Sequence, residues 1–94
     1  MALNDITNSF ETVGSYKEYK FQPAEQFIGV QLSFQEEGVA KVVIYQSLDG
    51  ESWVPFEIDY GVGKTYQKNI EGILTSQYIK IQCNLPPVKA LILE

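Results

Sequence analysis

The sequence contains no histidine and no arginine among its 94 residues. Without histidine, the chain lacks the commonest general base and the commonest transition-metal ligand, so a Ser-His-Asp or Cys-His site cannot form within it. Without arginine, it lacks the planar group that binds phosphate or guanine through two parallel hydrogen bonds. These absences argue against catalysis, and we expect neither enzymatic activity nor a cofactor.

Positive charge is scarce as well. The chain has twelve acidic residues and seven lysines, which gives a formal charge of −5. The lysines form no cluster along the chain. Nucleic-acid binding depends on basic patches that neutralise phosphates. The composition therefore predicts no nucleic-acid partner.

Cysteine is nearly absent, since Cys83 is the only one and no disulfide can form within the chain. Secreted domains of this size usually contain several disulfides, which favours a chain made in a reducing cytoplasm. Cys83 ends the strand-like run 78–83, where we expect a buried structural thiol. Residues 1–6 do not have the pattern of a signal peptide, and no stretch is long enough to span a membrane.

What the sequence does contain is apolar and aromatic residues in short, mostly alternating runs. Apolar residues make up 45% of the chain and aromatic residues 13%, a composition that suits strands. The runs recur roughly every ten residues with turn signals between them, which is typical of antiparallel sandwiches and barrels. We predict a single all-β domain, residues 1–94, folded as an antiparallel β-sandwich of jelly-roll or discoidin-like type with about seven to eight strands. Strands are expected over residues 16–21, 27–34, 39–46, 53–60, 64–70, 78–83 and 88–93.

Residues 1–15 mix polar and apolar side chains. Leu3, Ile6, Phe10 and Val13 have a spacing that suits one face of a helix. The residues between them are mostly Asn, Asp, Ser and Thr, which form turns more readily than helices. We therefore predict an N-terminal arm or an edge strand here, with these four side chains as candidate core residues.

The strongest local signal is the hairpin predicted over residues 42–56, in which two apolar runs flank a turn at Asp49-Gly50. The Asp49 carboxylate can accept backbone N–H groups of the turn, while Gly50 supplies a positive φ. Asp49 is also an oxygen donor for calcium, but the Asp-x-Asp-x-Asp-Gly spacing is absent, so we predict no metal site. We expect Trp53 to pack over the base of the hairpin. Ser47, Asp49, Gly50 and Trp53 are thus interpreted as structural residues.

Two further features are candidates for chemistry or binding. The adjacent pair Glu36-Glu37 is interpreted as a solvated turn rather than as a catalytic carboxylate pair. Tyr60 and Tyr66 flank the glycine-rich turn 61–63 and could project there as platforms for a sugar ring. The alternative is that both rings cover the rim of the sandwich. Tyr60 and Tyr66 are therefore candidate contacts for a ligand or a partner.

Ser47, Asp49, Gly50 and Trp53 form a Ser-x-Asp-Gly-x-x-Trp motif. This motif resembles a hairpin of discoidin-type (coagulation factor 5/8 C-type) sandwiches, and the run 76–81 resembles a later strand of the same folds. The chain is more similar in length to short β-sandwich structural proteins of tailed bacteriophages. These proteins often have the same Ser-x-Asp-Gly-x-x-Trp hairpin, followed by a glycine-rich turn and a Tyr-Ile-Lys-Ile-like strand, and the resemblance covers roughly residues 27–93. It implies a virion component: a capsid decoration or auxiliary protein, a head-fibre base, or a tail or baseplate module. No catalytic residue is implied.

We therefore expect a non-enzymatic virion structural protein that is assembled in the host cytoplasm. Its partners would be capsid or tail proteins, or further copies of itself, because the edges of a sandwich present unpaired backbone groups to other chains. Two alternatives stay open. One is a carbohydrate-binding module that uses Tyr60, Tyr66 or Trp53 to hold a glycan. The other is a small inhibitor that binds a host factor.

Overall fold

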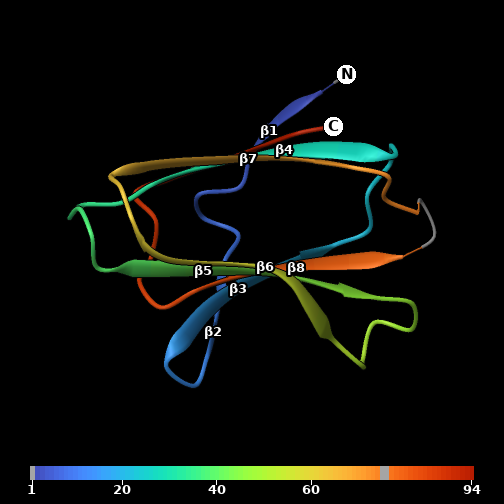
Figure 1. Cartoon of the computed structure of the whole chain (residues 1–94), viewed down its shortest axis with the longest axis horizontal. Helices are drawn as coiled ribbons and strands as arrows, with labels where there is room; N and C mark the ends of the chain where they lie inside the picture. The colour runs from blue at the N-terminus through green and yellow to red at the C-terminus, as the bar shows by residue number, and fades with distance from the viewer. Residues whose placement is uncertain (1, 75–76) are drawn as a thin grey trace.

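The computed structural model describes residues 2–74 and 77–94, and within them the chain forms nine strands and no helix. The strands make two antiparallel sheets that pack face to face (Figure 1). This confirms the predicted all-β antiparallel sandwich. In the part of the chain that the structure describes, no helix is long and apolar enough to cross a membrane.

The two sheets have four and five strands. Sheet A has the order β1 (Leu3–Asp5), β9 (Lys89–Leu93), β4 (Phe27–Ser33) and β7 (Thr65–Glu71). Sheet B has the order β2 (Glu11–Val13), β3 (Tyr16–Phe21), β8 (Tyr78–Cys83), β5 (Ala40–Ser47) and β6 (Val54–Val62). The segment predicted as an arm or edge strand supplies both β1 and β2, which are edge strands of different sheets.

The core lies between the sheets and follows the alternation of the central strands. In β4, Ile28, Val30 and Leu32 are buried, and the residues between them face outward. The facing positions of the other central strands are buried too: Val42, Ile44, Ile79, Ile81, Ala90 and Ile92. Burying one such aliphatic side chain contributes about 1.5–3 kcal/mol. This layer is therefore the main source of stability.

Of the four candidate core residues near the N-terminus, the structure buries one completely. Ile6 belongs to the core, and Phe10 packs against it. Leu3 and Val13 are exposed on the edge strands β1 and β2, so their assignment to the core is wrong. The helical spacing of the four residues has no structural counterpart, because β1 and β2 lie in different sheets.

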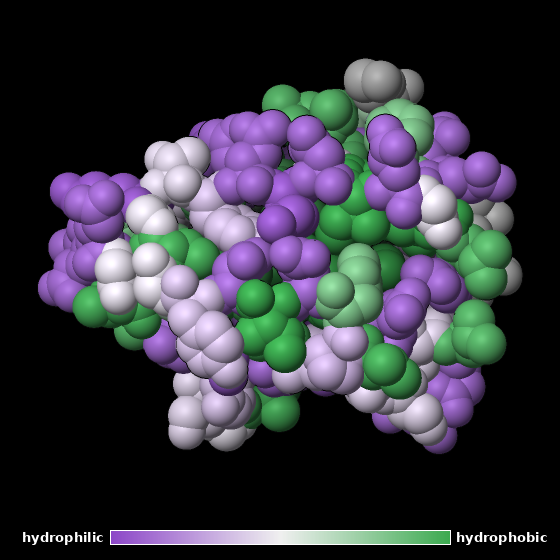
Figure 2. All heavy atoms as spheres, viewed as in Figure 1, coloured by the Kyte–Doolittle hydropathy of each residue, from purple (hydrophilic) through white to green (hydrophobic). Residues whose placement is uncertain are grey.

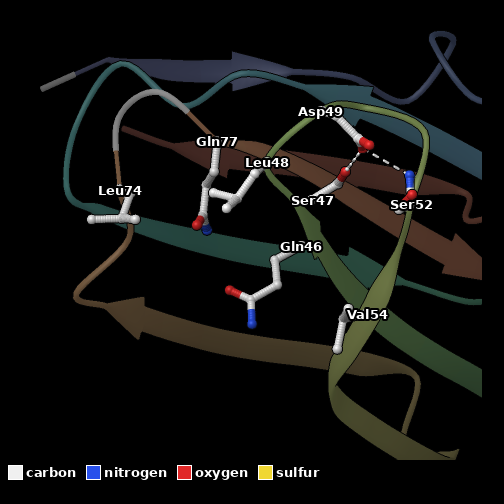
Figure 3. Close-up of a pocket in the computed structure, with 8 residues that line it drawn as sticks. All are labelled: Gln46, Ser47, Leu48, Asp49, Ser52, Val54, Leu74 and Gln77. Carbon is white, nitrogen blue, oxygen red and sulfur yellow. Dashed lines mark hydrogen bonds between the residues drawn. The ribbon is translucent and has the colours of Figure 1, made fainter.

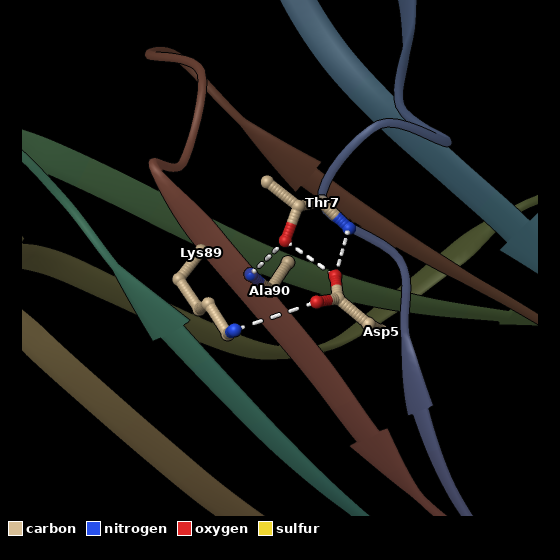
Figure 4. A network of polar contacts seen from close by, with 4 residues as sticks. All are labelled: Asp5, Thr7, Lys89 and Ala90. Carbon is tan, nitrogen blue, oxygen red and sulfur yellow. Dashed lines mark hydrogen bonds and ion pairs between the residues drawn. The ribbon is translucent and has the colours of Figure 1, made fainter.

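A polar cluster holds the end of β1 on β9 (Figure 4). The Asp5 carboxylate accepts the backbone N–H of Thr7 at 3.0 Å and its hydroxyl at 2.6 Å. The Thr7 hydroxyl oxygen accepts the backbone N–H of Ala90 at 2.9 Å, and Lys89 Nζ lies 3.4 Å from Asp5. The hydrogen bonds from Thr7, above all the one from its hydroxyl, lower the pKa of Asp5. After this cluster the chain leaves sheet A and continues to β2 in sheet B.

Irregular pairing of β5 with β6 decides which side chains of β6 face the core. The register shifts twice along this pair. Ile58 lies opposite Val43 on the outer face of sheet B and is exposed. Glu57 and Asp59 instead face β7 of sheet A, where Lys68 Nζ lies 2.8 Å from Glu57 and 3.7 Å from Asp59. An ion-pair cluster thus joins the two sheets beside the β6–β7 turn.

Cys83 is fully buried, which confirms the prediction of a buried thiol. It ends β8 and belongs to the core cluster. Burial raises the pKa of the thiol from its ordinary value of 9.0 to about 12. A thiol that keeps its proton in this way is a packing group and a poor nucleophile.

This burial predicts a loss of stability in alkaline solution. Between pH 9.0 and about 12 the unfolded chain releases the Cys83 proton while the folded chain keeps it. The free energy of unfolding therefore falls as the pH rises, by up to about 1.4 kcal/mol per pH unit, and the contribution is fully present at lower pH. Urea unfolding across this range should show a steeper decline for the wild type than for Cys83→Ala. Equal slopes for the two proteins would contradict the assignment.

Candidate functional site

The turn between β5 and β6 is built around one carboxylate. Oδ1 of Asp49 accepts the backbone N–H groups of Glu51 at 2.9 Å and Ser52 at 2.8 Å, and the Ser47 hydroxyl at 2.8 Å. The backbone N–H of Gly50 donates to the Ser47 hydroxyl oxygen at 2.9 Å. These hydrogen bonds, led by the one from Ser52, hold the pKa of Asp49 well below its usual range. The turn is therefore tied together by its own side chains.

Gly50 is the residue in this turn that requires a left-handed backbone, with φ at +78°. A Cβ atom built on Gly50 would lie 3.4 Å from the ring of Tyr78, at the start of β8. The turn thus packs directly on a neighbouring strand of sheet B. Glycine satisfies both the backbone conformation and the close approach.

The outer face of sheet B carries a buried ion pair that no local sequence pattern predicts. Glu18 of β3 and Lys80 of β8 are only 6% and 9% exposed, and Lys80 Nζ lies 3.8 Å from Glu18. The Gln82 amide donates to Glu18 at 2.6 Å and accepts the Tyr45 hydroxyl at 2.9 Å. Lys80 Nζ also lies 4.4 Å from the centre of the Tyr45 ring and 4.8 Å from that of Trp53. Trp53 therefore rests on this network.

A first hollow, which we call the leucine hollow, opens on one side of the turn and has a volume of 490 Å³ (Figure 3). Three large apolar side chains on its lining are mostly exposed: Leu48 by 74%, Val54 by 57% and Leu74 by 59%. The other lining residues are polar, namely Gln46, Ser47, Asp49, Ser52 and Gln77. The sequence does hint at this surface, because Leu48 is an apolar residue in the middle of a polar turn.

A second hollow, which we call the tryptophan hollow, also borders the turn and has a volume of 410 Å³. It is lined by Lys20, Phe21, Gln22, Asp49, Gly50, Glu51, Trp53 and Tyr78. The lining combines aromatic rings with amide, ammonium and carboxylate groups. Both hollows have volumes in the range of small-molecule sites.

Tyr60 and Tyr66 flank the same predicted turn, but the structure places them in different environments. Tyr60 is 73% exposed, and Lys41 Nζ lies 4.8 Å from its ring centre. Tyr66 is only 8% exposed, and its hydroxyl donates to Asp59 at 2.7 Å. Burial, together with this hydrogen bond, raises the pKa of Tyr66. Of the two alternatives, the projecting platform does not hold for Tyr66, because β7 turns its ring into the core.

The remaining candidates lie away from the hollows or outside the described residues. Glu36 and Glu37 are exposed in the segment that connects β4 to β5. Ser76, the first residue of the run that resembles a discoidin strand, lies outside the described residues. Across residues 2–74 and 77–94, no group of three or more Asp, Glu or Cys side chains is placed to hold a metal ion.

Figure 2 shows hydrophilic and hydrophobic residues interspersed over one face of the molecule. Hydrophobic residues reach the surface at the end where Figure 1 places the turn after β5 and the start of β8. That end carries the leucine hollow. The surface beside the hairpin turn is therefore the best-defined candidate for recognition.

Compared with protein-family profiles, curated proteins and solved structures, the chain matches none of them.

Proposed function

We propose that this protein is a non-enzymatic structural component of a tailed-bacteriophage virion that acts through protein–protein contacts. The proposal covers a capsid decoration or auxiliary protein, a head-fibre base, and a tail or baseplate module. The observation that carries it is the apolar rim of the leucine hollow, where Leu48, Val54 and Leu74 are each more than half exposed. Apolar side chains gathered at one place on a surface are typical of contact sites for other proteins.

The hairpin turn supports this role by fixing the shape of the surface. Leu48 stands between Ser47 and Asp49, both of which are held by hydrogen bonds within the turn. A rigid surface loses little conformational freedom when a partner binds, and this favours affinity. The polar lining beside the rim, including the Gln46 and Gln77 amides, offers hydrogen bonds that would orient the partner. The partner would be a capsid or tail protein, or a second copy of the chain.

The resemblance of the hairpin to those of small phage sandwiches supports the virion assignment. The four motif residues Ser47, Asp49, Gly50 and Trp53 all lie in or beside one turn, where three of them hold the backbone. In this proposal the motif is a scaffold, and the neighbouring apolar rim is the contact surface. Assembly in the host cytoplasm is part of the proposal.

The proposal can be tested by adding purified protein back to virions that lack it. Wild-type protein should bind such particles with a saturable stoichiometry in co-sedimentation. Leu48→Asp should weaken binding by at least about tenfold, because it places a charge against a partner's apolar surface. The matched control is Leu3→Asp, since Leu3 is 64% exposed but lies on β1 of sheet A. Equal binding by wild type and Leu48→Asp, or equal loss in both variants, would contradict the assigned surface.

A further inference from the structure

The tryptophan hollow combines two kinds of group that a sugar ring requires. Trp53, Tyr78 and Phe21 supply aromatic rings, on which the apolar face of a pyranose can stack. Lys20 and Glu51 supply a donor and an acceptor for hydroxyl groups on the rim of the ring. We infer that this hollow binds a neutral hexopyranose unit of a glycan, with Trp53 as the stacking platform.

The Trp53 ring is held in place before any ligand arrives. Lys80 Nζ lies 4.8 Å from the centre of this ring, and it is itself paired with the buried carboxylate of Glu18. The Tyr45 ring lies 4.4 Å from the same ammonium group. A ring positioned in this way loses little conformational freedom on binding, and this favours affinity for a weakly interacting sugar. The buried ion pair of sheet B thus has a role as a support for the platform.

The turn shapes the opposite part of the hollow. Asp49 lines this hollow, and its carboxylate is held in place because Oδ1 accepts the hydrogen bonds of the turn. Gly50 places no side chain over the Tyr78 ring, whereas a Cβ there would lie 3.4 Å from it. The hairpin therefore gives this part of the hollow a fixed shape and a carboxylate on its lining.

The charge around the hollow selects the class of sugar. The lining holds one lysine, Lys20, and two carboxylates, those of Asp49 and Glu51. The chain as a whole carries a formal charge of −5. A sialic or uronic acid would be repelled by this field, whereas a neutral hexose or N-acetylhexosamine would not. The site is therefore expected to discriminate against acidic glycans.

A printed array of defined neutral and acidic glycans tests the inference first. Binding to neutral hexopyranose-containing glycans, with little or none to acidic ones, is the expected result. No binding to any glycan, or binding to acidic glycans only, overturns it. The strongest neutral ligand is then titrated in soluble form. Because Trp53 is the only tryptophan of the chain, its fluorescence should change on saturation, and an unchanged spectrum also overturns the assignment.

Substitutions on the lining test whether the glycan binds in the tryptophan hollow. Trp53→Ala should weaken binding by roughly tenfold in calorimetric titration, the order expected for loss of an aromatic contact. Lys20→Ala and Glu51→Gln change exposed side chains that the fold does not need, so they keep the test valid if Trp53→Ala unfolds. Each should weaken binding severalfold. Tyr60→Ala is the matched control, because this exposed aromatic residue lies outside the hollow. Unchanged affinity in both rim variants, or equal loss in the control, overturns the site.

Discussion

Gly50→Val should lower the free energy of unfolding by about 2 kcal/mol, because φ at this position is +78° and a β-branched residue is strained there. The new side chain would also meet the Tyr78 ring, which lies 3.4 Å from the Cβ position. Chemical denaturation with circular dichroism measures the change. Gly50→Asn should cost less than Gly50→Val, because Asn adopts the left-handed conformation more readily.

Gly72→Val is the matched control for backbone strain alone. Gly72 has φ at +75°, and a Cβ there would meet nothing within 4 Å. The difference between the two valine variants therefore measures the packing of the turn on β8. If Gly50→Val kept full stability, the turn would not be the scaffold of the hairpin.

Glu18→Ala should be the second large effect, with a loss of about 3 kcal/mol in the free energy of unfolding. The reason is that the Lys80 side chain, which is 9% exposed, would be left buried without its carboxylate partner. Trp53 fluorescence should change in the same variant, since Lys80 lies 4.8 Å from its ring centre. Thermal and urea unfolding measure the first effect, and emission spectra of the folded variant measure the second.

Two controls distinguish the effect of burying an unpaired ionisable group from the effect of losing an ion pair. Glu57→Ala breaks a shorter ion pair, 2.8 Å from Lys68, but both side chains are about one-third exposed. It should cost less than about 1 kcal/mol, because solvent screens exposed pairs. The double variant Glu18→Leu/Lys80→Met should recover most of the stability that Glu18→Ala loses, since a buried pair is often replaceable by apolar groups. A loss in Glu18→Ala no greater than that in Glu57→Ala would show that Lys80 finds another partner or water.

The features that sequence alone could predict are those set by neighbouring residues. Alternation over Phe27–Ser33 identified the buried face of β4, and Asp49-Gly50 identified the turn of the β5–β6 hairpin. Cys83 could be placed in the core because its strand alternates in the same way. Each of these depends on the local periodicity of a strand or on the local chemistry of a turn.

The features that sequence missed depend on pairing between distant segments. Ile58 is exposed because the pairing of β6 with β5 shifts its register, which the alternation of β6 alone does not reveal. The alternation of β7 places Tyr66 on one face with Lys68 and Ile70, and only the packing of the two sheets decides that this face turns inward. Glu18 and Lys80 become a pair only when β3 lies beside β8. Leu48 and Leu74 line one hollow although they lie far apart in the sequence. Both hollows therefore form only when distant segments of the chain come together in the fold.

We propose that the hairpin is a scaffold and that the surfaces beside it serve recognition within a virion. The proposal requires that the gene belongs to a tailed phage, and mass spectrometry of density-purified virions of that phage tests it most directly. We predict that the chain is present at a fixed ratio to a capsid or tail protein and remains after high-salt washing. Detection of the chain in infected-cell lysate but not in the purified particles would contradict the proposal.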